Sequence, residues 1–458
     1  MNNELIIRSG STSVDFALLK DGRLVELHRD KEDNKFSVGD IFIAKIRKTV
    51  SGLNAAFVNV GYEKDGFLHY HDLGPQLSTL LKFVKRVSTG KLKDYSLKDF
   101  PKDQDINKNG KIPDVLKSNQ SILVQVVKEP ISTKGPRISS ELSIAGRYVV
   151  LVPFSDRISI SQKIESREEK ARLKRLVQSI RPKGFGVIVR TVAEGKKVAE
   201  LDRDLQNLTD RWNAMCKKLH NAHLPSKVLG EMNRASSILR DIFNDSFTGI
   251  CVDDETLYYQ LKDYLQEIAP HKENIVKLYQ NSIPIFEKFG IERQIKTSFG
   301  KTVSMSRGAY LVIEHTEALH VIDVNSGNRS NKAKSQEDTA LEVNMIAATE
   351  IARQLRLRDM GGIIVIDFID MNRPDNRKKL FNLLKDEMSD DRAKHKILPP
   401  SKFGLIQITR QRVRPEMNIK TREKDPNGDG EIEAPISVVN RIQTDLIKLL
   451  KKDYKKMT

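Results

Sequence analysis

Two aspartates, each closing an apolar, β-prone run, are the residues of this chain best suited to chemistry. Asp323 stands in VIDVNSG at 321–327, and Asp367 stands in GGIIVIDFIDM at 361–371. A Val/Ile run that ends in Asp predicts a buried strand whose C-terminal end delivers the carboxylate to the rim of a sheet. The competing interpretation is that either Asp caps a helix or forms a turn.

Asn325 follows Asp323 on the same turn and adds an amide oxygen to the two carboxylates. Such hard oxygen donors are the ligands that magnesium takes in proteins. The ion could polarise a phosphoryl oxygen and help generate hydroxide for in-line attack. The sequence shows no His or Cys cluster that competes for this role.

The segment between these two runs has the pattern of one amphipathic helix. Ser335 is a suitable N-cap, acidic residues follow it, and Gly361 follows the basic last turn. Apolar residues recur at steps of four and three at Leu341, Met345, Ala348, Ala352 and Leu355. Strand, helix and strand therefore predict a parallel crossover that brings Asp323 and Asp367 to one edge of a sheet.

Three stretches carry a resemblance to a known family: TEALHVIDVNSG, IARQLRLRDMGGIIVIDFIDM and SKFGLIQITRQR. They closely resemble the bacterial ribonuclease E/G family. The resemblance implies that Asp323, Asn325 and Asp367 surround a magnesium ion, for which manganese could substitute, in a DNase I-like catalytic domain. Asp370 is not among the ligands that it implies, and we interpret that residue as a structural strand end.

The resemblance also implies an α/β multidomain fold. An RNase H-like domain contains an inserted S1-type OB-fold and a 5' sensor domain, and the DNase I-like α/β domain follows. The implied boundaries are 1–35 and 236–299 for the two parts of the RNase H-like domain, 36–139 for the OB-fold, 140–235 for the sensor, 300–420 for the catalytic domain, and 421–458 for a degenerate zinc-link region with an amphipathic helix.

Short strands and Gly turns between 36 and 139 are typical of a small barrel, which binds single strands by stacking bases on aromatics in a basic groove. Core packing is the commoner fate of a strand Phe, but the resemblance makes Phe57 and Phe67 stacking platforms. Lys128 and Lys134 flank the strand that follows. A lysine-rich insert at about 76–118 shows little apolar periodicity, and we expect a mobile basic loop that adds phosphate contacts.

In VIVRTVAEG, Arg190 and Thr191 fall where the family has a pocket for the 5' monophosphate of its substrate. An Arg fork beside a hydroxyl suits a terminal phosphate. Two other sensor positions depart from the family, with Gln162 in place of one Arg and Lys394 in place of another. Lysine keeps the charge but forms no bidentate fork.

The zinc link of the family is missing. TREKDPNGDGEIE runs through the place of its CPxC motif, and the chain has only Cys216 and Cys251, far apart and without a CxxC partner. Without those thiolates we expect no zinc. Beyond this point Ile436, Val439, Ile442, Leu446 and Leu449 predict an amphipathic helix, and we expect a homodimer without shared zinc or a monomer.

A net charge of +17 and a pI near 9.5 favour a polyanionic partner, although lysine-rich surfaces also serve solubility. No stretch approaches the roughly 20 apolar residues of a membrane span, so we expect a cytoplasmic protein with no membrane partner. By resemblance it is an endoribonuclease for single-stranded, A/U-rich RNA that prefers 5'-monophosphorylated ends and acts on rRNA precursors and mRNA. The alternatives are a non-catalytic RNA-binding or ribosome-associated factor and, less favoured, a DNA nuclease.

Overall fold

The computed structural model describes residues 2–417 apart from 11–12, 32–35, 93, 131–133, 231–233, 245, 317, 328–334, 402–403 and 413–415, and beyond them 419, 422–424, 431–433, 442 and 446. The chain divides into two compact units. Unit 1 comprises Met1–Glu32 and Asp245–Thr458, and unit 2 comprises Asp33–Asn244. Each unit is described by itself.

The first sheet of unit 1 joins the N-terminus to a segment more than two hundred residues later. Its five strands have the order β15-β14-β1-β2-β3, and β1 pairs with β14 in parallel. The strands are β1 Asn3–Ser9, β2 Ser13–Lys20, β3 Arg23–Lys31, β14 Phe247–Val252 and β15 Val276–Leu278, and the associated helices are α6 Glu255–Ile268, η4 Pro270–Ile275, α7 Ile285–Lys288 and α8 Ile291–Ser298. The N-terminal strands thus begin a sheet that a later segment completes, as the sequence predicts.

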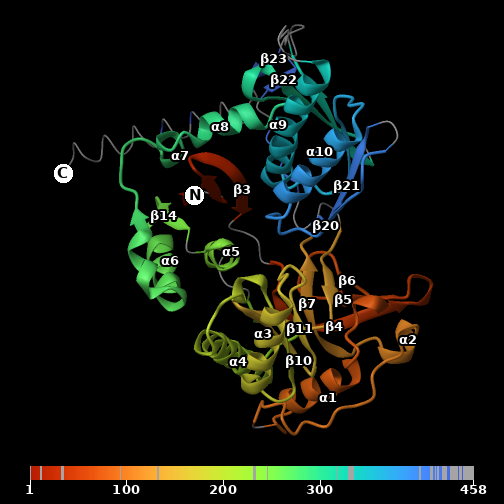
Figure 1. The fold of residues 1–458 in the computed structure, drawn as a ribbon. Helices are drawn as coiled ribbons and strands as arrows, with labels where there is room; N and C mark the ends of the chain where they lie inside the picture. The colour runs from red at the N-terminus through yellow and green to blue at the C-terminus, as the bar shows by residue number, and fades with distance from the viewer. Residues whose placement is uncertain are drawn as a thin grey trace, which may run out of the picture. The chain divides into compact units, whose positions relative to one another are not determined.

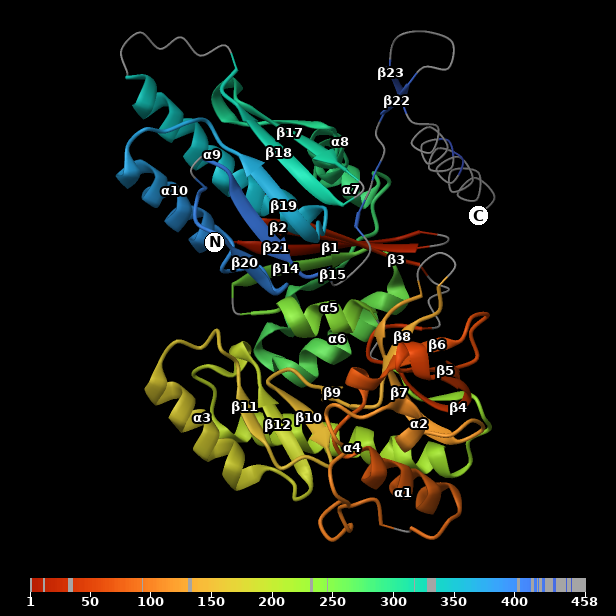
Figure 2. The same cartoon turned by 90° about the vertical axis from the view of Figure 1, so that its right-hand side faces the viewer.

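The second sheet of unit 1 carries the aspartates. Its strand order is β16-β17-β18-β19-β21-β20, and β18 and β19 run parallel. The strands are β16 Thr302–Ser304, β17 Tyr310–His315, β18 Leu319–Asn325, β19 Gly362–Asp367, β20 His395–Ile397 and β21 Ile406–Arg410, with η5 Ser306–Gly308, α9 Gln336–Leu357 and α10 Pro374–Glu387. Helices α9 and α10 lie side by side along the sheet (Figure 1; Figure 2) and share one apolar core with β18 and β19.

Helix α9 forms where the sequence predicts it. The Ser335 side chain accepts a hydrogen bond from the backbone N–H of Asp338, as an N-cap does. Ala348, Ala352 and Leu355 are buried, whereas Leu341 is half-buried against the same core. The parallel crossover from β18 through α9 to β19 is confirmed.

Unit 2 begins with a small barrel. Strands follow the order β13-β4-β5-β6-β8-β7, and an additional pairing between β4 and β7 closes the ring. The strands are β4 Ile41–Val50, β5 Ala55–Asn59, β6 Gly66–His69, β7 Ser121–Lys128, β8 Arg137–Ser139 and β13 Ser226–Leu229, with the 3₁₀ turns η1 Ser51–Leu53 and η2 Tyr70–Asp72. Ala56, Val58 and Leu68 fill its interior, and a small closed barrel of short strands is OB-like.

The expectation of a mobile, aperiodic loop at 76–118 is wrong. The first part of this insert forms α1 Leu77–Ser88, and α2 Ile112–Val115 precedes β7. Leu80, Phe83 and Val87 of α1 are buried in a core shared with the barrel strands. Their spacing of three and four is that of a helix face, which the many lysines of the insert obscure.

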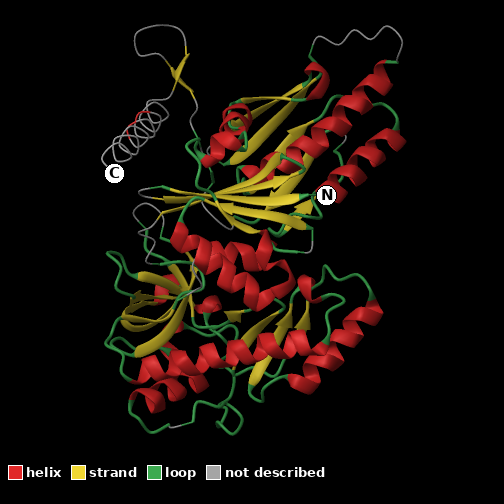
Figure 3. Ribbon diagram, turned by 90° about the vertical axis from the view of Figure 1, so that its left-hand side faces the viewer, coloured by secondary structure: helices red, strands yellow, loops and turns green. Residues whose placement is uncertain are grey.

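The rest of unit 2 is a four-stranded sheet of order β11-β12-β10-β9. Its elements are β9 Ile144–Ala145, β10 Val149–Pro153, β11 Ile158–Ile160, β12 Phe185–Val189, α3 Arg167–Ile180, η3 Thr191–Ala193, α4 Val198–His220 and α5 Arg234–Ile242. Helix α4 is one long helix (Figure 3), and its Leu201, Leu208 and Trp212 pack into the core of this sheet.

Most of the segment 421–458 lies outside the described residues. Strands β22 Arg422–Lys424 and β23 Glu431–Glu433 pair with each other. Of the helix predicted near the C-terminus, only Ile442 and Leu446 are described; both are helical and exposed. Among the described residues, none of the helices has the length and apolar character that crossing a bilayer requires.

Candidate active site and RNA-binding surfaces

Asp323 and Asp367 are direct neighbours on the second sheet of unit 1. The parallel register pairs their Cα atoms across β18 and β19, and paired strands lie about 4.8 Å apart. Both side chains are exposed, whereas the neighbouring Ile322 and Ile366 are buried against α9. The two carboxylates therefore lie on the face of the sheet opposite the helix-covered core, at the edge that the crossover predicts.

The donor set at this edge fits a hard divalent cation. Burial and the negative charges of Asp323 and Asp370 raise the pKa of Asp367. A cation between two such carboxylates relieves their repulsion, and oxygen donors suit magnesium. Asn325 Nδ2 donates a hydrogen bond of 2.7 Å to Asp323 Oδ2, which orients that carboxylate.

The loop that follows Asp367 is fixed by α9. Asn344, fully buried, donates to the carbonyl oxygen of Ile369 at 2.7 Å and accepts from its N–H at 3.0 Å. Glu337 accepts hydrogen bonds from the backbone of Asn372 and Arg373, and these bonds hold its pKa below the usual range. From the sequence, Glu337 is only one of the acidic residues in the first turn of the helix, because its partners lie beyond the next strand.

Phe57 and Phe67 are on the outside of the barrel. They are register partners on β5 and β6, with ring centroids 5.9 Å apart in an edge-on arrangement. Both are half-buried, and the core-facing positions beside them are Ala56, Val58 and Leu68. The alternative that these two rings fill the barrel core is therefore wrong.

A cavity of about 580 Å³ lies at these rings, and we call it the aromatic cavity. Both phenyl rings line it, and Lys48 Nζ stands 5.2 Å from the Phe57 centroid. Its basic lining residues are Lys48, Lys64, Lys128, Lys134 and Arg137, against the acidic Asp65 and Glu129. The excess of positive charge around two aromatic faces suits a single-stranded nucleic acid.

Arg190 and Thr191 lie at the end of β12 with their polar groups engaged inside unit 2. Arg190 donates to Asp241 Oδ1 at 2.7 Å and to the Gly146 carbonyl at 2.8 Å. The Thr191 hydroxyl is 2.8 Å from that of Ser161. Burial acts to raise the pKa of Asp241, but the charges of Arg240 and Arg190 outweigh it and lower that pKa.

The two positions that depart from the expected family pattern lie in different units. Gln162 is exposed in unit 2, directly after Ser161, and Lys394 is exposed in unit 1 between α10 and β20. The Lys394 carbonyl accepts from the N–H of Gln411.

Two further sets of partners could not be predicted from the sequence. One is Asp241, which is far from Arg190 in the chain. The other is a cluster of His315, His320 and Glu416 in unit 1, whose donor atoms all lie within 4.8 Å of one another. The two histidines could have been found from the HTEALH sequence of the hairpin, but no pattern in the sequence indicates that Glu416 joins them.

Comparison with known proteins decides the family. Residues 143–413 match the model of the Ribonuclease E/G family. Ribonuclease G of Haemophilus influenzae is 31% identical over 448 residues, which cover 97% of this chain and 87% of that protein. Ribonuclease G of Escherichia coli is 31% identical over 451 residues, 98% of this chain and 88% of that one. The chain belongs to the ribonuclease E/G family.

Membership confirms the resemblance seen in the three motifs, and by homology this chain is an endoribonuclease. Ribonuclease E of a Nostoc species is 35% identical over 379 residues, which cover 82% of this chain but 51% of that protein. The stretch that matches the family model includes Arg190, Asp323 and Asp367 but not the barrel strands β4 to β8. The ribonuclease G matches, which cover nearly the whole chain, extend the similarity beyond that stretch.

Proposed function

We propose that this chain is a magnesium-dependent endoribonuclease that cleaves single-stranded, A/U-rich RNA, prefers 5'-monophosphorylated substrates, and acts in rRNA maturation and mRNA decay. The parallel register of Asp323 with Asp367, beside Asn325, carries the proposal. In this interpretation β16–β21 with α9 and α10 form the DNase I-like domain, and the five-stranded sheet of unit 1 belongs to the RNase H-like domain.

Asp323 and Asp367 would hold the ion, and Asn325 would keep the Asp323 carboxylate in its orientation. Magnesium, when bound, supplies charge that stabilises the developing negative charge on a phosphoryl oxygen and lowers the pKa of water. Manganese offers the same octahedral oxygen chemistry. Because both carboxylates stand on the exposed face of the sheet, a phosphodiester can approach them without displacing the core. Cleavage would leave a 5' phosphate and a 3' hydroxyl.

The aromatic cavity would hold the substrate strand. Phe57 and Phe67 present ring faces on which bases can stack, and stacking tolerates any base. Lys128 and Lys134 would contact phosphates, which adds affinity without sequence preference. A duplex cannot offer unstacked bases to the rings, so single strands are favoured.

Arg190 and Thr191 would recognise the 5' monophosphate. The Arg190 guanidinium is shared with Asp241, so an incoming phosphate must compete with a carboxylate for the same donors. The phosphate carries more negative charge than the carboxylate, and this favours the exchange. Lys394 would contribute charge but no fork. The resulting preference for 5'-phosphorylated ends is therefore moderate.

Turnover of a short, 5'-phosphorylated, A/U-rich oligonucleotide tests the function. We expect products with 5' phosphates in the presence of Mg²⁺ or Mn²⁺ and none in excess chelator. The same oligonucleotide in deoxyribose form should remain intact. Salt-sensitive binding of the RNA without any products would instead support a non-catalytic RNA-binding factor.

A further inference from the structure

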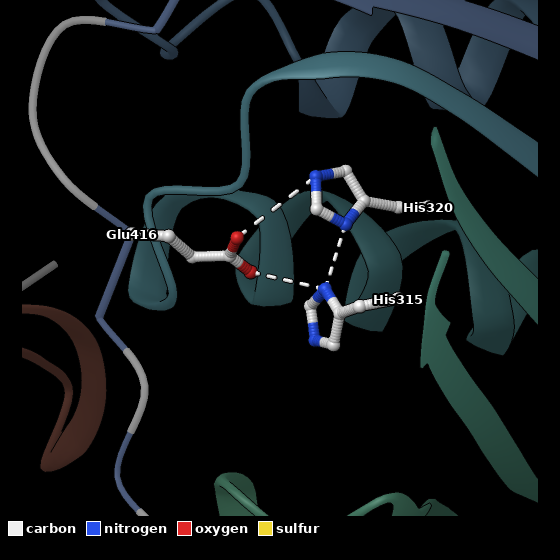
Figure 4. A group of neighbouring side chains, drawn as sticks. All are labelled: His315, His320 and Glu416. Carbon is white, nitrogen blue, oxygen red and sulfur yellow. Dashed lines mark hydrogen bonds and ion pairs between the residues drawn. The ribbon is translucent and has the colours of Figure 1, made fainter. Parts of the chain in front are cut away.

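A second group of potential ligands lies in unit 1, away from the aspartates. His315 ends β17 and His320 lies near the start of β18, where the two are register partners across the hairpin. Figure 4 shows both imidazoles turned toward Glu416, which follows β21 in the chain. His315 Nδ1 is 2.7 Å from His320 Nδ1 and 3.3 Å from Glu416 Oε1.

The hydrogen bonds around His320 prepare one ring nitrogen as a ligand. The residue is only 4% exposed, and its Nε2 lies 3.1 Å from the carbonyl oxygen of Gly361. A carbonyl only accepts, so Nε2 carries the proton, and neutral His320 presents the lone pair of Nδ1 toward His315. A metal-binding histidine usually donates one ring N–H to a backbone carbonyl and offers its other nitrogen to the ion. In the structure, that second nitrogen of His320 is within hydrogen-bond distance of His315 Nδ1.

The hairpin fixes the two histidines before any ion arrives. The Thr316 hydroxyl accepts from the N–H of Leu319 at 3.0 Å, and the Thr316 N–H donates to the Leu319 carbonyl at 2.9 Å. These bonds close the turn between β17 and β18. Two of the three donors are therefore preorganised, and only the Glu416 segment must be brought to them.

We propose that His315, His320 and Glu416 bind one transition-metal ion of the zinc class. Two imidazoles and a carboxylate form a donor set that zinc takes, with a fourth position for water. Bonds of about 2.0 to 2.1 Å in a tetrahedron place neighbouring donor atoms about 3.3 Å apart. The distance from His315 Nδ1 to Glu416 Oε1 already has this value, and the two Nδ1 atoms would have to separate by about half an ångström. Glu416 Oε2 also lies 3.9 Å from the other ring nitrogen of His320, Nε2.

Nearby charge acts on this cluster in both directions. Burial lowers the pKa of His315, whereas the negative charge of Glu416 acts to raise it. The Arg358 guanidinium also faces the cluster and opposes a cation. Its side chain, however, donates to Gln354 Oε1 and to the carbonyls of Ser298 and Gly300, while Glu416 supplies compensating negative charge.

The site would act as a clip and is separate from the aspartates. His320 faces the buried side of β18, whereas Asp323 is exposed on the other side, three residues and about 10 Å along the strand. Glu416 precedes Met417, whose N–H donates to the Arg358 carbonyl. A bound ion would thus fasten the chain after β21 to the β17–β18 hairpin. This proposal departs from the expectation of no zinc, which considered only cysteine ligands.

Metal titration of the full chain tests the clip. The protein is stripped with chelator, desalted and titrated with Co²⁺, whose visible absorption reports tetrahedral nitrogen and oxygen ligation, and with Zn²⁺ in competition with a chromogenic chelator. We expect one equivalent bound and a higher Tm with zinc, because the ion binds only the folded state. His315→Gln and Glu416→Gln should each weaken zinc binding about a hundredfold or more, since even partners of ligands contribute 10- to 100-fold.

Two matched variants keep this test specific. His28→Gln removes another histidine of unit 1 that stands beside a carboxylate, Glu26 at 3.0 Å, and should leave zinc binding unchanged. Asp323→Asn should also leave it unchanged. The proposal would be overturned if the folded protein bound no zinc ion tightly. It would also be overturned if zinc binding persisted in His315→Gln and Glu416→Gln. His315 is partly exposed, so its substitution should leave the fold intact. RNA cleavage by the His315→Gln variant is measured as well. Lost zinc binding with normal cleavage would concern the clip alone, whereas absence of cleavage in the unmodified protein would concern the proposed nuclease.

Discussion

We call the edge that carries Asp323, Asp367 and Asn325 the carboxylate edge. It and the aromatic cavity of unit 2 are built in the same way, but their side chains interact differently. In both, side chains of adjacent strands pair across the outer face, while the alternate residues fill a core. At the edge, the negative charge of Asp323 raises the pKa of Asp367, and a bound cation would relieve this repulsion. At the cavity, Phe57 and Phe67 already contact each other within a basic rim. Under the proposed function, the edge would need an ion before cleavage, whereas the cavity could accept an RNA strand as it stands.

Under the proposed function, chemistry takes place at the edge and affinity comes from the cavity. A change at the edge should lower kcat and leave RNA binding intact, because the strand is held elsewhere. A change at the cavity should raise KM and leave kcat unchanged at saturation, because uniform binding is lost.

Asp323→Asn should have the largest effect. It removes one of two charged ligands, and the metal's stabilisation of a developing phosphoryl charge amounts to several kcal/mol, so kcat should fall about 10³-fold at 1.36 kcal/mol per tenfold. The Kd for RNA, measured by fluorescence anisotropy in chelator, should not change. Asp370→Asn, at an exposed carboxylate of the same segment, is the control and should cost far less. Equal losses in the two variants would contradict the assignment of the ligands.

Phe57→Ala and Phe67→Ala should produce the next largest effect. Stacking of a base on an aromatic ring contributes about 1 to 3 kcal/mol, so each change should raise Kd and KM by roughly 5- to 150-fold. Tyr259→Ala, at an exposed aromatic of unit 1, should change neither. A drop in kcat at saturating RNA would show that the cavity takes part in catalysis and would remove the contrast between the two regions.

Local patterns of the carboxylate edge were readable from the sequence. Strands of Val and Ile, a Ser335 cap and a helical period of apolar residues all agree on one crossover, and the register of Asp323 with Asp367 follows from it. The hydrogen-bond partners that fix the loop after Asp367 could not be predicted from the sequence. Asn344 and Glu337 act on residues about 25 to 36 positions away, and no periodicity reports such contacts.

For the barrel, the strands could be predicted from the sequence but the direction of their side chains could not. Alternation identified its strands, but whether Phe57 faces the core or the outside depends on register, which a single strand does not reveal. The charge of the insert obscured its helix, because the lysines of α1 lie on its solvent side while Leu80 and Phe83 are buried. The Arg190 to Asp241 pair joins residues from separate elements, so only the folded chain displays it.

Arg190→Gln should change the preference for the 5' end by about tenfold. A hydrogen bond to a charged group contributes about 1.5 to 3 kcal/mol, and competition from Asp241 places the effect near the lower limit. The measurement is the ratio of kcat/KM for 5'-monophosphate and 5'-hydroxyl forms of one oligonucleotide, so each variant is its own control. Arg190→Lys should keep part of the preference. An unchanged ratio in Arg190→Gln would remove this residue from 5'-end recognition and leave the comparison of edge and cavity intact.

Lys128→Gln and Lys134→Gln should have the smallest effects, and salt makes them visible. Each lysine that neutralises a phosphate of a single strand contributes about 0.7 to the slope of log K against log salt concentration. Each variant should therefore bind RNA a few-fold more weakly at low salt and show a correspondingly shallower slope, with no change in kcat. Lys174→Gln, on an exposed position of α3 in the same unit, should leave the slope unchanged. If all three variants reduce the slope equally, the electrostatic attraction for RNA comes from the net charge of +17 as a whole. The aromatic cavity would then contribute to RNA binding through its rings alone.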